Sequence, residues 1–145
     1  MKRVLMLASV ASMIDQFNMP NIALLQKLGY QVDVACNFIE GNTCSDARVA
    51  ELKQKLQDMH VHCYQIDFAR NIKHMGQNMR ALRQVEGLMK QNGYAFCHCH
   101  SPIGGVVARI AGHRTRTKVI YTAHGFHFYQ GAPVMNWLVV IAKRI

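Results

Sequence analysis

Two hydrophobic patterns alternate along this chain of 145 residues, and this alternation constrains the fold more than any other feature. Short apolar runs typical of buried strands are interleaved with segments whose apolar residues recur every three or four positions, as in helices. The strand-like runs are residues 4–8, 32–36, 61–66, 94–99 and 118–122. The helix-like segments are residues 20–28, 49–59, 71–91, 104–111 and 133–145. The pattern predicts an α/β fold: a Rossmann-like, doubly wound parallel sheet of about five strands in a three-layer α/β/α arrangement.

The size and composition agree with one folded domain over residues 1–145. Only 17% of the residues are charged and 50% are hydrophobic, which excludes a disordered chain. No apolar run approaches the ~18–20 residues of a membrane-spanning helix. The first residues resemble a signal peptide, but Asp15, Gln16 and Asn18 follow where a cleavage site would be expected. We therefore expect a first strand of a cytoplasmic protein.

The net charge indicates which classes of partner are favoured, and the number of cysteines indicates whether the thiols are reduced. Seventeen Lys and Arg against eight Asp and Glu give a formal net charge of +9, which favours anionic partners: nucleic acid, phosphorylated small molecules or an anionic membrane face. No nucleic-acid-binding motif accompanies this charge, so we expect no nucleic acid partner, and a solvated basic surface is the simplest interpretation. The five cysteines are odd in number, which favours reduced thiols over a disulfide framework.

Ligands of doubly wound sheets bind at the carboxyl ends of the strands, where the strand order reverses. With the order 3-2-1-4-5, the loops at that crevice are residues 9–18, 98–105 and 123–131. The first loop lacks Gly-x-Gly-x-x-Gly, so NAD or FAD is not expected. Ser9, Ser12 and Asp15 could bind a hydroxylated ligand, or the loop could serve only for turns and capping, with Asn18 capping the next helix.

The run Cys97-His98-Cys99-His100 offers four potential metal ligands, but a strand sends alternate side chains to opposite faces. We therefore predict no metal site and expect the two thiols to pack against helices. His100 and Ser101 fall at the end of the fourth strand, where a crevice ligand would lie. Similarly, we expect the methionine-rich stripe of the segment 71–91 to fill the core rather than form a partner groove.

The third loop is rich in chemically useful side chains. It contains Gly125, Phe126, His127 and Tyr129, and His124 directly follows the fifth strand. Aromatic faces can stack on sugar rings, and a histidine can donate a hydrogen bond or transfer a proton near neutral pH. The alternative is a hydrogen-bonded structural histidine in a packed loop.

On these residues the chain resembles the amino-terminal domain of glycosyltransferase family 4, in the branch that builds capsular and exopolysaccharides. The matching stretches are residues 14–17 with Pro20, 29–36, 98–105 and, most specifically, 119–133. The resemblance implies two Rossmann-like domains with the active site between them. It implies retaining transfer from a nucleotide-sugar donor, without a metal ion or other cofactor, in polysaccharide biosynthesis.

The resemblance also implies roles for particular parts. The amino-terminal domain would bind the acceptor, often a polyprenyl-diphosphate-linked glycan at the inner face of the cell membrane, and His124 would reach the donor sugar. The acceptor would contact the residues singled out above: Ser9, Ser12, Asp15, His100, Ser101, Gly125, Phe126, His127 and Tyr129. Relatives often carry His where Met13 stands, and the donor-binding domain with its E-x₇-E signature is absent from these residues.

Three interpretations follow from this sequence. The first is the acceptor-binding part of a glycosyltransferase, inactive alone and truncated inside the apolar segment that ends at Ile145. The second is a subunit of a split transferase. The third is a basic module for an anionic surface, for which residues 134–140 with Trp137, followed by Lys143 and Arg144, resemble an interfacial helix. A core or interdomain helix is the alternative for that segment.

Overall fold

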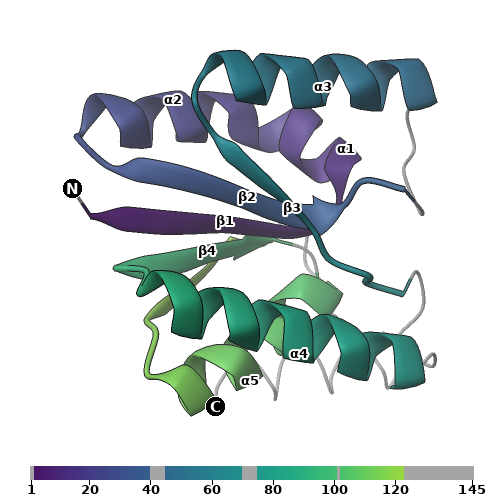
Figure 1. Cartoon of the computed structure of the whole chain (residues 1–145), viewed down its shortest axis with the longest axis vertical. Helices are drawn as coiled ribbons and strands as arrows, with labels where there is room; N and C mark the ends of the chain where they lie inside the picture. Colours follow the sequence, from purple (N-terminus) through teal and green to yellow (C-terminus); the bar gives the residue numbers. More distant parts are fainter. Residues whose placement is uncertain (1, 40–44, 70–74, 101, 123–145) are drawn as a thin grey trace, which may run out of the picture.

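A computed structural model of the chain describes residues 2–39, 45–69, 75–100 and 102–122. Its centre is one parallel sheet in the order β3-β2-β1-β4-β5, which confirms the predicted fold class and agrees with the strand order assumed in placing the ligand loops (Figure 1). The strands are β1 (Arg3–Val10), β2 (Gln31–Asn37), β3 (His62–Gln65), β4 (Phe96–His100) and β5 (Val119–Thr122). In register, Leu7 of β1 lies beside Ala35 of β2 and Cys99 of β4.

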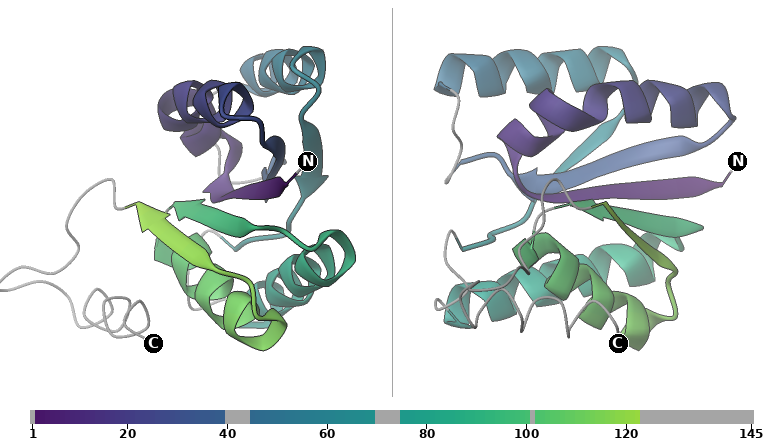
Figure 2. Two further views of the ribbon diagram at one scale, coloured as in Figure 1. Left: turned by 90° about the vertical axis from the view of Figure 1, so that its left-hand side faces the viewer. Right: turned by 180° about the vertical axis from the view of Figure 1, so that it is seen from behind.

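Helices cover both faces of the sheet. They are α1 (Ala11–Met13), the π-helical turn η1 (Ile14–Asn18), α2 (Met19–Lys27), α3 (Asp46–Asp58), α4 (Met75–Asn92) and α5 (Pro102–Thr115). Figures 1 and 2 show α1, α2 and α3 on one face and α4 and α5 on the other. The described residues therefore form the three α/β/α layers that the alternating pattern predicts.

The central strand explains why its sequence is continuously apolar. Leu5 and Leu7 pack into the core beneath α4 and α5, whereas Met6 and Ala8 pack into the core beneath α1, α2 and α3. Successive side chains of a strand point to opposite faces, so a strand covered on both faces needs an apolar residue at every position.

The predicted loop 9–18 is wrong, because the chain passes from β1 directly into helical turns. Ser9 still belongs to β1, and residues 11–27 form one nearly continuous helical run. Asn18 makes no side-chain cap of α2. Its fully buried amide donates instead to the Met13 carbonyl at 2.9 Å, five residues earlier, within the π turn. The extra residue of that turn leaves a carbonyl that this side chain satisfies.

The methionine stripe of α4 fills the core only in part. Leu82, Val85 and Met89 are buried, but Met75 is 66% exposed and Met79 is 43% exposed. The expectation of core filling is therefore wrong for the first turns of α4, where the two methionines line an apolar groove against α5.

A buried polar network ties the amino-terminal edge of the sheet together. The carboxylate of Asp33 is fully buried and accepts hydrogen bonds from Arg3 at 3.0 Å and Tyr94 at 2.7 Å. Arg3 also donates to Asn92 at 2.9 Å, so the network joins β1, β2 and the connection from α4 to β4. Burial and the hydrogen bond to Asp33 raise the pKa of Tyr94 well above its ordinary value. This edge is opposite the one where ligands bind in such sheets, so we assign it to stability.

The described cysteines are free thiols, and Cys97 and Cys99 lie in the core beneath α4 and α5 as predicted. Burial raises the pKa of the Cys97 thiol. No helix in the described segments is long and apolar enough to cross a membrane.

Candidate functional site

The strand order of the sheet reverses between β1 and β4. β1 lies between β2 and β4, and its chain continues into α1, while β4 ends at His100 and α5 begins at Pro102. Both helical runs therefore start at this edge with their amino-terminal ends, where backbone N–H groups and the helix dipole favour negative charge. The fold therefore has the reversal of strand order on which the prediction rested, and a ligand crevice there stays a prediction.

Of the predicted ligand residues after β1, Ser9 is half-buried and Ser12 is buried. The Asp15 carboxylate accepts two hydrogen bonds from the guanidinium of Arg48, at 2.9 and 3.0 Å. Arg48 lies in the first turn of α3, where its backbone N–H also bonds the capping hydroxyl of Ser45. The bond to Asp15 raises the pKa of Arg48. Asp15 therefore joins the π turn to α3, and its contact with an acceptor stays a prediction.

At the end of β4, His98 and His100 share the face opposite the two thiols, as predicted from the alternation of a strand. Their rings contact each other with centroids 4.2 Å apart. His100 is fully buried, with its Nε2 atom 3.1 Å from the sulfur of Met6, and His98 pairs with the hydroxyl of Thr122. His100 is therefore a fully packed residue at the end of β4, and its contact with a ligand stays a prediction.

Nowhere in residues 2–39, 45–69, 75–100 and 102–122 do three His, Cys, Asp or Glu side chains gather to form a metal-binding group. The remaining predicted site residues lie outside the described part of the chain: Ser101, His124, Gly125, Phe126, His127 and Tyr129. β5 ends at Thr122, which pairs with His100 of β4, so these two strands end at the same edge of the sheet.

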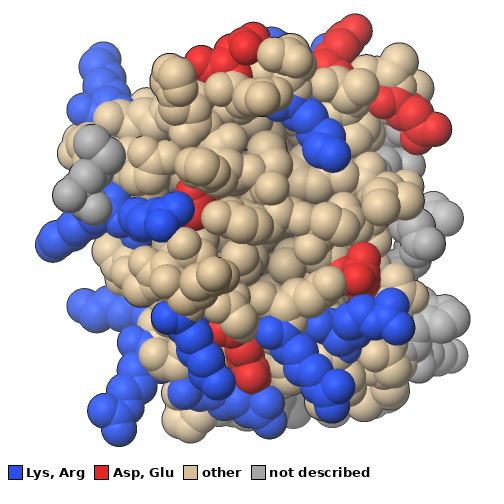
Figure 3. Space-filling view, in the orientation of Figure 1, with Lys and Arg blue, Asp and Glu red and all other residues tan. Residues whose placement is uncertain are grey.

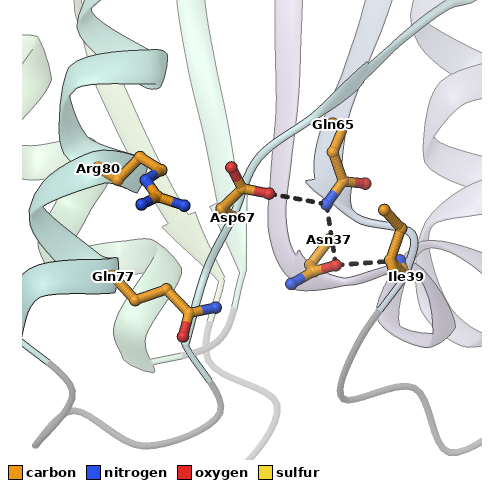
Figure 4. A pocket seen from close by; sticks show the side chains of 6 residues that line it. All are labelled: Asn37, Ile39, Gln65, Asp67, Gln77 and Arg80. Atoms are coloured by element: carbon orange, nitrogen blue, oxygen red, sulfur yellow. Dashed lines mark hydrogen bonds between the residues drawn. The ribbon is translucent and has the colours of Figure 1, made fainter.

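Sequence reasoning missed a polar cavity at the carboxyl ends of β2 and β3. Its volume is about 330 Å³. Figure 4 shows its lining, which comes from the ends of β2 and β3, the residues just after them and the first turns of α4: Asn37, Ile39, Gln65, Asp67, Gln77 and Arg80. We name this cavity the β2–β3 pocket.

Hydrogen bonds hold the side chains of the β2–β3 pocket in place. The Gln65 amide donates to Asn37 at 3.0 Å and to Asp67 at 3.3 Å. Gln84 of α4 donates to the other oxygen of Asp67 at 2.9 Å. The sequence held a signal for this pocket, since polar residues follow directly on two predicted strands, Asn37 after residues 32–36 and Asp67 after residues 61–66. The predicted ligand residues came instead from the loops after the first, fourth and fifth strands.

Comparisons with known proteins agree on one family. A family model described as "Glycosyl transferase 4-like" matches residues 3–144. The Bacillus subtilis (strain 168) protein named "Putative glycosyltransferase EpsD" is 35% identical over 141 residues, which cover 95% of this chain and 33% of that protein. The chain therefore spans about a third of the length of this relative.

Solved structures share the fold at lower identity. MurG of Acinetobacter baumannii superposes with a TM-score of 0.66 at 18% identity, over 100% of this chain and 40% of MurG. Anabaena HepE, in a complex with UDP and glucose, superposes with a TM-score of 0.66 at 15% identity, over 99% of this chain and 35% of HepE. At these identities, the similarity establishes the fold.

Proposed function

The chain belongs to the glycosyl transferase 4-like family, and from this premise we propose that it is the acceptor-binding part of a retaining glycosyltransferase. The reaction transfers a sugar from a nucleotide-sugar donor to a glycan acceptor, which we propose is linked to polyprenyl diphosphate in surface polysaccharide synthesis. The observation that carries the proposal is the family match over residues 3–144. The reversal of strand order between β1 and β4 supports it, because ligands of such folds bind at the carboxyl ends of the strands there.

The chemistry breaks the bond between the anomeric carbon and the nucleoside diphosphate, and an acceptor hydroxyl forms the new glycosidic bond and loses its proton. We assign His124 to the donor sugar, where an imidazole can donate a hydrogen bond or accept a proton. Gly125, Phe126, His127 and Tyr129 would contact the sugars beside it. In the same proposal, Ser9, Ser12, Asp15, His100 and Ser101 form the acceptor side of the crevice, and no metal ion takes part.

The donor-binding part is the partner that this proposal requires. Since the chain covers about a third of its relative from Bacillus subtilis, the rest of the active site would come from a further domain of the same polypeptide or from a separate subunit. We expect residues 1–145 alone to show no turnover of nucleotide sugars. Activity that appears only when a separately expressed donor-binding protein is added would favour the split transferase.

The test uses the chain joined to its donor-binding part, with a panel of nucleotide sugars and lipid-linked acceptors. We expect His124→Ala to lower kcat by about 10²–10⁴ if His124 transfers a proton, and less if it only positions the donor. His113→Ala is the matched control, because His113 is exposed near the end of α5. Full activity of the His124 variant would refute the assignment of His124, and unchanged activity in EDTA is expected if no metal takes part.

We also propose that the protein works at the cytoplasmic face of an anionic membrane. The apolar groove between α4 and α5 supports this proposal, because Met75, Met79 and Ile110 line it and are exposed. Figure 3 shows Lys and Arg side chains gathered over the half of the molecule that α4 and α5 form. Apolar side chains beside basic ones are the pattern that binds anionic lipid surfaces.

Co-sedimentation with vesicles tests the membrane proposal. We expect binding to vesicles that contain phosphatidylglycerol, weaker binding at high salt, and little binding to pure phosphatidylcholine. The double variant Met75→Ser, Met79→Ser should lower binding, whereas Leu28→Ser should not, because Leu28 is exposed after α2 on the opposite face of the sheet. Equal binding of both variants would remove the α4–α5 groove from the proposal.

A further inference from the structure

We propose that the β2–β3 pocket is a sugar subsite that takes one monosaccharide bearing a carboxylate or phosphate group. The inference rests on the proposed function, since the ligand would be a unit of the acceptor glycan. The pocket opens at the carboxyl ends of β2 and β3, the same edge of the parallel sheet at which β1 and β4 end. An extended acceptor lying along this edge would reach it from the crevice.

The floor of the pocket is rigid before any ligand binds. Asn37 is 2% exposed, and its amide donates to the Phe68 carbonyl at 3.0 Å while its oxygen accepts from the Ile39 backbone at 3.0 Å. The oxygen of Gln65 accepts from the Phe38 backbone at 2.9 Å. Both amides are thereby fixed between the ends of β2 and β3. Polar groups held in place in advance bind a ligand at a lower entropic cost.

Asp67 supplies acceptors suited to sugar hydroxyls. Each of its carboxylate oxygens already accepts from one amide, Gln65 on one side and Gln84 on the other. A carboxylate has about four acceptor positions, so about two remain for a ligand. A pair of acceptor positions on one rigid carboxylate matches two neighbouring hydroxyls of a pyranose ring.

Arg80 supplies the charge that selects an anionic sugar. Its side chain reaches from α4 toward the cavity, on the side of Asp67 (Figure 4). Within the described residues Arg3, Arg48 and Arg114 each form an ion pair with a carboxylate, but no ion pair or hydrogen bond engages Arg80. A guanidinium presents parallel N–H donors that match a carboxylate or phosphate group. A neutral sugar would leave this group without a charged partner.

The size and the apolar part of the lining limit the ligand to a single sugar unit. A volume of about 330 Å³ lies at the lower end of the range for ligand cavities, ~300–1,000 Å³. Among the described residues that line the pocket there is no aromatic ring for a nucleobase, and the apolar side chain among them, Ile39, is 73% exposed. That side chain can pack against the C–H face of a sugar ring.

Calorimetric titration of the 145-residue chain with D-glucuronate, glucose 1-phosphate, D-glucose and inorganic phosphate tests the inference. We expect the two anionic sugars to bind about tenfold or more tightly than either D-glucose or phosphate, because only they engage both Arg80 and Asp67. Arg80→Gln should remove that advantage over D-glucose, and Arg80→Lys should restore part of it for glucose 1-phosphate. The control is Arg83→Gln, since Arg83 is exposed on the same helix but does not line the pocket.

The outcomes separate this inference from the proposed function. Equal binding of phosphate and the anionic sugars, or equal affinities in the Arg80 and Arg83 variants, would overturn the sugar subsite. Transferase activity of the two-domain protein that depends on His124 would still stand in that case. Conversely, selective binding at Arg80 in a protein that transfers no sugar would support the subsite and overturn the proposed function.

Discussion

Replacing Gly112 by alanine tests the packing that positions β5. Gly112 lies in α5, and a Cβ built there would meet Val119 Cγ2 at 2.5 Å and the Thr117 carbonyl oxygen at 2.7 Å. The valine methyl can rotate away. The carbonyl cannot move easily, because the same turn is held by a hydrogen bond from Thr117 N to Gly112 O at 2.9 Å. The turn or the helix must therefore shift.

The expected free-energy change has two opposing parts. Forcing an extra methyl group into a packed site costs about 1–3 kcal/mol. Alanine gains about 0.8–1.0 kcal/mol over glycine in a helix interior, which offsets part of that cost. We therefore expect Gly112→Ala to lower the free energy of unfolding by up to about 2 kcal/mol.

Gly87→Ala is the matched control, because Gly87 lies in α4 and a Cβ there would meet no atom within 4 Å. This variant should gain about 0.5–1 kcal/mol. The helical gain is common to both variants, so their difference of about 1–3 kcal/mol isolates the contact with the α5–β5 turn. Urea unfolding followed by circular dichroism measures both values, with Tm as a second reading at about 2–4 °C per kcal/mol.

Equal stability of the two variants would refute this reasoning. It would mean that a methyl group fits beside Gly112, and that the contact of Gly112 with the turn before β5 does not fix the position of that strand. A loss in the Gly87 variant as large as that of the Gly112 variant would refute it as well, because the helical gain assumed for both would be absent.

Three further predictions concern the buried polar groups and thiols. Asp33→Asn should lower the free energy of unfolding by roughly 1–3 kcal/mol in urea titrations, because Arg3 loses its charged partner, and stability equal to the wild type would contradict this. Burial raises the pKa of Tyr121 to about 12, above its value of about 10 in the unfolded chain. The free energy of unfolding should therefore be highest below pH ~10 and fall as the pH rises toward 12. Between pH 8 and 11, the Tyr121→Phe variant should lose less of its free energy of unfolding than the wild type. Cys97, whose buried thiol has a raised pKa, should react with N-ethylmaleimide more slowly than half-buried Cys63 in the native protein and at a similar rate in urea, as measured by peptide mass spectrometry.

Local patterns were sufficient for the architecture. The continuous apolar run of the first strand, with alternate residues in two cores, predicts a strand covered on both faces, and the structure confirms it at Leu5 and Met6. The same alternation separated the thiols from the histidines at the end of β4. The family resemblance, carried most specifically by the residues 119–133 themselves, needed no knowledge of contacts, and the comparisons support the family.

Contacts between segments distant in the sequence decided which of the predicted residues are paired and which are exposed. Asp15 was predicted as a ligand residue, but Arg48 lies 33 positions later in the chain and pairs with it. Met75 and Met79 follow the same helical spacing as Met89, yet they line an apolar groove beside α5 and are exposed, whereas Met89 is buried.

The sequence by itself therefore determined the α/β architecture and the number of strands, and it pointed to the carboxyl edge of the sheet as the place for a ligand site, whereas the structure showed the strand order. The tertiary structure alone decided which side chains at that edge are paired, which are buried, and that Asn37, Gln65 and Asp67 share a pocket with Arg80. The physical reason is that hydrophobic periodicity shows only which residues lie on the same face of one helix or strand. Pairing and exposure depend instead on what another element, tens of residues away, brings beside it.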